Sequence, residues 1–460
     1  MTECNTRKLI FHPQKRRAVT GAFDGGAMTS DAGALLLREI ELKVGAIRRF
    51  AACFTDHRDP KRVRHGVYEL LKQRVFALAC GYEDLNDHEA LQHDPLLWLL
   101  VGAEEPEGTP ASPSTLNRLE LSAAEGGVSD RYKRLELDEE AAQEVLLDLW
   151  LAGREEPGAK EWVVLDLDAT DVELHGGQEG RAFNGYYCCY CYLPLYIFEG
   201  EHLLWAQLRP SNKDQAAGSR EAVERIVGRL RAKWPWVRVL VRGDSGFCRE
   251  ELMAWCEANG VDYVLGLARN ARLSVRIETQ MAEARAEQER SGAPARRFAD
   301  FSYRTLDSWS RSRRVVAKAE HLGKGPNPRF VVTSLGAADS DARALYEDVY
   351  CARGDMENRI KETQLALYAD RTSSRAFKTN QLRLRLSALA YVLLSLLRRV
   401  GLRGGEWARA QCGTIRERLL KIGACVRVSV RRIYVSISES YPWKRHFFRV
   451  LERLRAHAFG

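Results

Sequence analysis

Three acidic residues stand where the sequence predicts the ends of two strands and a helix that could pack beside them. Asp168 ends the apolar run WVVLDLD, Asp244 ends VRVLVRGD, and Glu357 lies in the helical stretch YCARGDMENRIKE. Carboxylates brought within a few ångströms tolerate one another only when a cation lies between them. Their oxygens suit Mg²⁺ and Mn²⁺, and two such ions about 4 Å apart can promote phosphodiester transfer. The three residues therefore predict a two-metal site.

The elements that must position these acids are predicted to form one mixed sheet. Short apolar runs predict five strands, at residues 162–168, 192–198, 202–208, 237–244 and 262–268. Glu199-Gly200-Glu201 predicts a hairpin turn between the second and third strands. Helical patterns occupy residues 214–233 and 249–259. Three strands followed by an alternation of strand and helix predict an α/β fold with a mixed sheet of ribonuclease-H type.

Positive charge is concentrated in the last fifth of the chain. The 460 residues carry a formal charge of +8, while residues 371–460 hold 20 Lys and Arg against 4 Asp and Glu. Their balance of +16 leaves −8 for residues 1–370. This asymmetry indicates a polyanionic partner, and nucleic acid fits best, although a solvated basic surface without a partner gives the same pattern.

Composition predicts a soluble globular protein of a reducing compartment. Apolar residues make up 45% of the chain and charged residues 29%, which excludes disordered, collagenous and coiled-coil classes. The 11 cysteines are odd in number, unlike a secreted disulfide scaffold. No signal-like apolar run is present at the start, and the longest apolar stretch, residues 386–397, has 12 residues where a bilayer needs roughly 20. We therefore expect a cytoplasmic location and no membrane partner.

Several long stretches carry a family resemblance. They are FDGGAMTSDAGALLLREIE (23–41), CFTDHRDPKRV (53–63), GYEDLNDHEALQHDPLL (81–97), RGDSGFCREELMAWCEANGVDYVLGLARN (242–270) and RGDMENRIKE (353–362). With them the chain resembles the DDE transposases of bacterial insertion sequences, specifically the group-one DDE transposase domain typical of insertion-sequence family thirteen-eighty. The resemblance covers nearly the whole chain. It implies a ribonuclease-H-like catalytic core that cuts and rejoins DNA at transposon ends with two divalent ions, Mg²⁺ or Mn²⁺.

The resemblance also assigns the catalytic triad. In related transposases the first aspartate is followed by a small residue and a threonine, which matches Asp168 rather than its neighbours Asp166 and Asp171. The second aspartate matches Asp244 in Gly-Asp-Ser-Gly, and the glutamate matches Glu357. These three residues are thereby predicted to be both the catalytic residues and the metal ligands.

The helix that carries the glutamate departs from the related pattern at one position. In a related branch the motif reads Tyr-x2-Arg-x3-Glu-x6-Lys, and Tyr350, Arg353 and Glu357 fit it, but Gln364 replaces the lysine. Lys361 lies one helical turn after Glu357 and could supply the missing charge. Tyr350, Arg353, Lys361 and Gln364 are therefore the predicted contacts to DNA phosphate.

The spacing of the triad leaves room for an inserted segment. Asp168 and Asp244 are 76 residues apart, whereas Asp244 and Glu357 are 113 apart, more than the core needs. The surplus looks like the β-rich subdomain that related transposases carry before the third acid. The predicted organisation is a helical N-terminal DNA-binding module (1–155), the first part of the core (156–270), the β-rich insertion (271–338), the second part with the Glu357 helix (339–400) and a basic C-terminal region (401–460).

The resemblance further implies double-stranded DNA as the partner, both as transposon ends carrying terminal inverted repeats and as target, with a homodimer in the synaptic complex. It also implies a bacterial, nucleoid-associated location. Two other functions stay open: a catalytically inactive DNA-binding derivative, and a stand-alone metal-dependent nuclease of the same fold. The intact triad disfavours the first. The helical N-terminal module and basic C-terminus disfavour the second, because a nuclease needs neither.

Other residues have both a functional and a structural interpretation. Trp309, inside the inserted segment, could stack on an unpaired base, although most tryptophans are core residues. The histidines His57, His88 and His93 are predicted to lie in polar loops or on helix surfaces. Cys188, Cys189 and Cys191 could bind zinc with nearby histidines, but their spacing matches no common zinc pattern and favours ordinary thiols in a strand.

Overall fold

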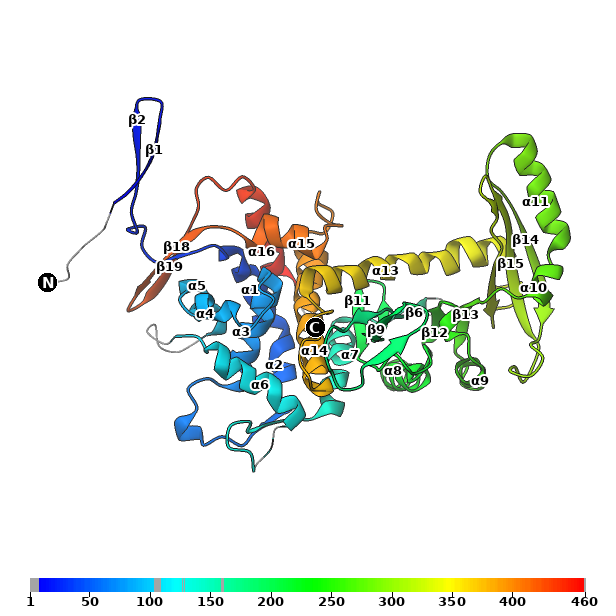
Figure 1. Ribbon diagram of the computed structural model, residues 1–460, viewed down its shortest axis with the longest axis horizontal. Coiled ribbons are helices and arrows are strands. Elements are labelled where there is room, and N and C mark those ends of the chain that lie inside the picture. Colours follow the sequence, from blue (N-terminus) through cyan, green and yellow to red (C-terminus); the bar gives the residue numbers. More distant parts are fainter. Residues whose placement is uncertain (1–7, 103–108, 126, 128, 159–160, 459–460) are drawn as a thin grey trace. The chain divides into compact units, whose positions relative to one another are not determined.

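The computed structural model describes residues 8–102, 109–125, 127, 129–158 and 161–458 (Figure 1). The chain divides into two compact units, of which the first joins Met1–Leu137 to Leu389–Phe459 and the second is Asp138–Ala388. The five-segment organisation stays a prediction beside this coarser division. Within the described part of the chain, every helix is too short or too polar to cross a membrane.

The second unit is built on a nine-stranded mixed sheet with the order β11-β10-β6-β12-β13-β17-β15-β14, and β16 pairs beside β15. Its first five strands are β6 (Trp162–Ala169), β10 (Leu195–Glu199), β11 (His202–Gln207), β12 (Arg238–Gly243) and β13 (Asp262–Leu267). Strand β10 is antiparallel to β6 and β11, whereas β12 is parallel to β6 and β13. The expected mixed α/β sheet is confirmed.

The pairing of β6 with β12 decides where the first two acids lie. Val163, Leu165 and Leu167 alternate along β6 and are fully buried in one core cluster, as expected for a central strand covered by helices. Leu167 pairs with Gly243 in parallel register. Asp168 and Asp244, the next residue of each chain segment, therefore emerge together at the same edge of the sheet.

Helices cover both faces of this sheet. The core cluster that contains Leu165 also takes in Leu147, Ile226 and Met253 from three helices. These helices are α7 (Glu139–Gly153), α8 (Ser219–Lys233) and α9 (Glu250–Ala258). Alternate residues of the strands, such as Val264, form a second cluster on the opposite face.

That opposite face is covered by the helical stretch that carries the third acid. Leu345 and Tyr346, near the start of this stretch, pack against Val264 and Val331 of the sheet. The stretch runs through α12 (Ala342–Ala344), η4 (Leu345–Tyr350), η5 (Cys351–Arg353), α13 (Gly354–Lys361) and η6 (Glu362–Ala366). This packing of the first turns on the sheet sets the direction of the helical stretch and so the position of Glu357 along it.

The segment predicted as a β-rich insertion extends the core sheet. Strand β13 pairs antiparallel with β17, which pairs with β15, which pairs with β14. The segment comprises α10 (Ala271–Val275), α11 (Glu278–Ser291), β14 (Ala295–Tyr303), β15 (Arg313–Leu322), β16 (Gly325–Pro326) and β17 (Arg329–Thr333). Because β13 would otherwise expose unpaired backbone groups at an edge, this addition satisfies them.

In its described residues, the first unit is mainly helical and contains three small sheets. Its longer helices are α1 (Leu35–Val44), α2 (Ala46–Ala51), α3 (Val67–Cys80), α5 (Pro95–Val101), α6 (Pro113–Glu125) and α16 (Lys444–Ala456). Its sheets are β1 (Leu9–Gln14) with β2 (Arg17–Gly21), β4 (Phe54–Asp56) with β5 (Leu135–Leu137), and the order β19 (Arg432–Ile437), β18 (Ala424–Ser429), β3 (Met28–Thr29). Helix α14 (Phe377–Leu396) contains the boundary between the units.

Direct contacts join the N-terminal and C-terminal parts of the first unit. The Ala32 N–H donates to the Ile422 carbonyl at 3.0 Å, and Lys421 forms an ion pair with Asp31 at 2.7 Å. A Cβ at Gly33 would lie 1.6 Å from the Leu419 carbonyl oxygen, so only glycine permits this close approach. Residues 31–33 and 419–422 are therefore parts of one packed structure.

His88 is buried inside this unit, so the prediction that it lies on a polar surface is wrong. Its side chain is 0% exposed, and Arg74 Nη1 donates to His88 Nε2 at 3.2 Å. Burial, with the neighbouring charge of Arg74, lowers the pKa of His88 from 6.5 to about 3. The sequence misled because the helix α4 (Asp87–Leu91) is polar overall, and only one of its faces packs inward.

His88 should make the stability of the protein fall in mild acid. Its folded pKa lies below its unfolded value of 6.5, so the unfolded chain takes up the proton first as the pH decreases. The free energy of unfolding should then fall by about 1.4 kcal/mol per pH unit between about pH 6 and pH 3. Urea unfolding at a series of pH values would measure this slope. The slope should be shallower in His88→Gln and unchanged in the exposed control His93→Gln.

Candidate active site

Asp244 is held in one orientation at the end of β12. Its side chain accepts the Gly246 N–H at 2.9 Å and so caps the short helix η3 (Ser245–Phe247). Gln215 Nε2 lies 3.1 Å from each of the two Asp244 carboxylate oxygens. A Cβ at Gly246 would lie 2.0 Å from Gln215 Oε1, so glycine is needed for this approach. The second predicted acid is therefore oriented from two sides.

Arg353 joins the first and third acids. Its Nη2 donates to Glu357 Oε1 at 2.8 Å, four residues along the helix, and its Nη1 lies 3.7 Å from Asp168 Oδ1. Burial alone would lower the pKa of Arg353, but the charges of Asp168, Glu357 and Asp244 raise it above its usual value. The guanidinium thus serves as the counter-charge of the predicted triad.

Asp168 is close enough to Asp244 and Glu357 for their charges to affect its pKa. Burial raises the pKa of Asp168 to about 7, Arg353 opposes this rise, and the charges of Asp244 and Glu357 add to it. The structure therefore brings together Asp168, Asp244, Glu357 and Arg353.

The donor chemistry of this cluster fits divalent cations. Three carboxylates offer hard oxygen ligands, and Arg353 Nη1 is a buried donor without a hydrogen bond beside them. In this arrangement, however, the guanidinium lies between Asp168 and Glu357, and no group of three His, Cys, Asp or Glu side chains among the described residues has metal-binding geometry. Metal binding at these acids would require Arg353 to turn away.

Tyr350 lies against the turn that carries Asp244. A Cβ at Gly266 would lie 2.7 Å from the Tyr350 hydroxyl and 2.8 Å from the Ser245 nitrogen, so a glycine in β13 leaves room for both. Burial raises the pKa of Tyr350, Arg353 opposes this, and Asp244 adds to it. The hydroxyl is therefore a protonated donor at neutral pH.

One buried ion pair near the site was not identified from the sequence. Arg242 donates to both oxygens of Asp166, at 2.6 and 2.7 Å, and its Nη1 donates to the Val349 carbonyl at 2.6 Å. It thereby links β6 and β12 to the helical stretch before Glu357. The sequence did contain a signal for this ion pair. Asp166 and Arg242 each precede a predicted catalytic aspartate by two residues, and residues two apart share one face of a strand.

The remaining predicted contacts lie in varied surroundings. Gln364 Nε2 donates to the Asp171 carbonyl at 3.3 Å, whereas Lys361 is exposed and has no ion pair with any described residue. Trp309 is only 3% exposed, with its ring edge-on to Tyr303 at 5.8 Å. A base could stack on Trp309 only if this loop opened.

The three cysteines of the predicted strand differ in exposure. Cys188 is exposed, Cys189 is half-buried and Cys191 is buried, and the last two lie in β9 (Cys189–Tyr192). This strand belongs to a small sheet with β7 (Val172–Glu173) and β8 (Ala182–Asn184). Burial comes first among the causes that raise the pKa of the Cys191 thiol to about 11, which keeps it protonated at neutral pH.

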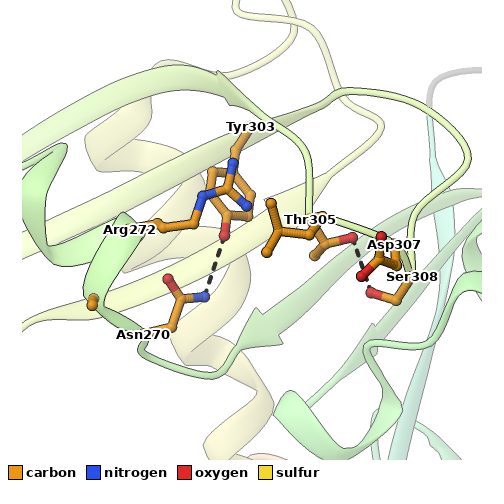
Figure 2. A pocket seen from close by; sticks show the side chains of 8 residues that line it. Asn270, Arg272, Tyr303, Thr305, Asp307 and Ser308 are labelled. Atoms are coloured by element: carbon orange, nitrogen blue, oxygen red, sulfur yellow. Dashed lines mark hydrogen bonds between the residues drawn. The ribbon is translucent and has the colours of Figure 1, made fainter.

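A separate pocket of about 460 Å³ lies in the inserted segment, beside Trp309 in the sequence (Figure 2). Asn270 Nδ2 donates to the Tyr303 hydroxyl at 3.3 Å, and Ser308 donates to Thr305 at 2.9 Å. None of the three predicted catalytic acids lines this pocket. It is therefore distinct from the acidic cluster.

Comparison with known proteins agrees with the sequence resemblance. The family model for "Transposase DDE domain group 1" matches residues 11–459. No curated protein sequence matches the chain. Among solved structures, the chain is similar to a piggyBac transposase in a synaptic complex with hairpin DNA, determined by cryo-electron microscopy. The sequence identity is 9% and the TM-score 0.39, over 85% of this chain and 79% of that chain.

Loss of Arg242 should destabilise the framework of the site. Arg242→Leu leaves Asp166 buried without its partner, and we expect the free energy of unfolding to fall by about 3 to 5 kcal/mol. Urea denaturation would measure this loss. The double variant Asp166→Asn/Arg242→Leu should lose less, and Arg238→Leu, an exposed arginine of the same strand, should lose little. A loss below about 1 kcal/mol in Arg242→Leu would contradict the role of the ion pair.

Proposed function

Because the chain belongs to the transposase DDE domain group 1 family, we propose that it is a DNA transposase of a bacterial insertion sequence. It binds the terminal inverted repeats of its element and catalyses metal-dependent DNA cleavage and strand transfer. Two observations support this proposal: the strand register that brings Asp168 beside Asp244, and the contacts of Arg353 to Asp168 and Glu357.

The sheet topology supports a ribonuclease-H-like core. The strand order is β11-β10-β6-β12-β13, in which β10 alone runs antiparallel to the other four strands, and this is the arrangement expected for that fold. In it, the first acid lies on the central strand and the second on its parallel neighbour. The insertion-sequence family number thirteen-eighty remains part of the proposal.

In this mechanism Asp168, Asp244 and Glu357 would hold two divalent ions, Mg²⁺ or Mn²⁺. When bound, such ions activate the attacking oxygen and stabilise the leaving oxygen of a phosphodiester. Gln215 and the Gly246 N–H keep the Asp244 carboxylate oriented. Arg353, once turned away from the carboxylates, can offer its planar guanidinium to the substrate phosphate.

The partners in this proposal are double-stranded DNA, as element ends and as target, and a second copy of the chain in the synaptic complex. A bacterial cytoplasmic, nucleoid-associated location goes with it. The inactive derivative and the stand-alone nuclease are the alternatives. Incubation with linear DNA carrying the terminal repeats, with and without Mg²⁺, separates them: a transposase cuts at the repeat ends, a nuclease cuts without regard to the repeats, and an inactive derivative only binds.

Neutralising any one triad residue should abolish cleavage but not binding. Asp168→Asn, Asp244→Asn and Glu357→Gln each remove a ligand for the ions at the scissile phosphate, whereas these residues add little to groove recognition. End cleavage and end binding would be measured separately on the same DNA. Asp171→Asn, the neighbouring aspartate, is the matched control and should cut normally. Retained cleavage in one of the three variants would remove that residue from the site.

Ca²⁺ should support assembly without cleavage.

Lys361 should supply the charge that Gln364 lacks. Lys361→Ala is expected to slow cleavage by at least about tenfold, or roughly 1.4 kcal/mol of transition-state stabilisation, and Gln364→Lys added to it should partly restore the rate. Single-turnover cleavage would measure both. Lys324→Ala, another exposed lysine, is the control. Near-normal cleavage by Lys361→Ala would show that this lysine is only a solvated side chain.

A further inference from the structure

Much of the positive charge in the C-terminal region is used inside the protein. Arg398 is 0% exposed and donates to the Ala410 carbonyl at 3.1 Å. Arg416 donates to the Ala79 carbonyl at 2.9 Å, and Lys421 is paired with Asp31. Arg453 donates to the Gly401 carbonyl at 3.1 Å. These residues hold the first unit together, so the charge balance of the sequence overstates the surface available to DNA.

The hairpin of β18 and β19 keeps its arginines free. Arg427 pairs across the strands with Tyr434, and Ser429 pairs with Arg432, so these residues share one face, with Arg431 in the turn. All five are exposed. Among the described residues, the guanidinium groups of Arg427, Arg431 and Arg432 form no ion pair, and that of Arg432 donates to the Tyr434 hydroxyl at 3.5 Å. The sequence from 421 to 438 contains no acidic residue.

The base of the hairpin is anchored while its tip projects. Ala424 and Val426, on the opposite face from Arg427, are 2% and 4% exposed, and Val435 packs on the same cluster as Phe447 of α16. Beyond them both faces are solvated, and Val430 at the turn is fully exposed. The arginines are therefore presented on a two-stranded ribbon with a fixed root, which lowers the entropy lost when they bind.

Exposed and half-buried arginines elsewhere in the described chain are often neutralised. Arg220 pairs with Glu224, Arg285 with Glu289 and Arg343 with Glu347, each four residues along a helix at 2.8 to 2.9 Å. Their charge is balanced locally, whereas that of the hairpin is not. The contrast favours a partner that is itself a polyanion.

We propose that the β18–β19 hairpin is a DNA-binding ribbon in which Arg427, Arg431 and Arg432 contact phosphates of duplex DNA. A two-stranded ribbon fits the major groove, and a guanidinium matches the geometry of a phosphate. This inference rests on the proposed function, because it takes DNA as the substrate. The exposed Val428 and Ile433, on the other face, would instead dominate if the hairpin bound a second copy of the chain.

The salt dependence of DNA binding tests the ribbon. The probe is a fluorescein-labelled duplex of arbitrary sequence, titrated with the full chain at several salt concentrations without divalent metal. Each lost phosphate contact lowers the slope of log K against log salt by about 0.9, so Arg427→Ala/Arg431→Ala/Arg432→Ala should lower it by up to about 2.7. Affinity at moderate salt should fall at least about tenfold. Arg427→Lys/Arg431→Lys/Arg432→Lys should keep most of the slope and most of the affinity.

The matched control removes the same charge from neutralised positions. Arg220→Ala/Arg285→Ala/Arg343→Ala should bind DNA with a nearly normal slope, and circular dichroism should show that both triple variants are folded. An unchanged slope in the folded hairpin variant, with normal binding by the unsubstituted chain, overturns the ribbon but not the proposed function. Absence of binding by the unsubstituted chain overturns both. Dissociation of a dimer by Val428→Ser/Ile433→Ser, with DNA affinity unchanged in the arginine variant, would assign the hairpin to a protein interface.

Discussion

The burial of like charges is the constraint on which the site depends. Burial raises the pKa of Asp168 to about 7, the charges of Asp244 and Glu357 add to this rise, and the Arg353 guanidinium opposes it. The surrounding contacts keep the acids from separating. Strand pairing fixes Asp168 beside Asp244, and Arg242 links both strands to the backbone before Glu357. The framework thus keeps three carboxylates close together, and a more highly charged cation could offset their repulsion.

The sequence predicted the parts of the site that follow from local pattern. Apolar runs ending in Asp168 and Asp244 indicated strand ends, and parallel pairing makes such ends adjacent. Gln215 could not be found this way, because it lies in a loop and reaches Asp244 only through tertiary folding. His88 was misjudged for the same reason, since burial depends on which helix face meets a neighbour.

The net charge of the sequence indicated the class of partner, but it did not show which positive charges lie on the surface. A count of arginines does not distinguish a guanidinium that donates to backbone carbonyls, such as Arg416, from one held in solvent, such as Arg431. The inserted segment raises a similar point. Its β-rich character was expected from the resemblance to related transposases, but whether its strands formed a sheet of their own or joined β13 depended on a free edge, which sequence pattern does not reveal.

The close approach of Gly33 to Leu419 has a consequence for the folding of the protein during translation. The second unit is one continuous segment and can fold as it emerges, whereas the first unit is complete only after residues 389–458 have been made. A nascent or prematurely terminated polypeptide therefore contains the acids before it contains a finished helical unit. Translation itself therefore delays completion of that unit until the residues that follow the second unit have been made.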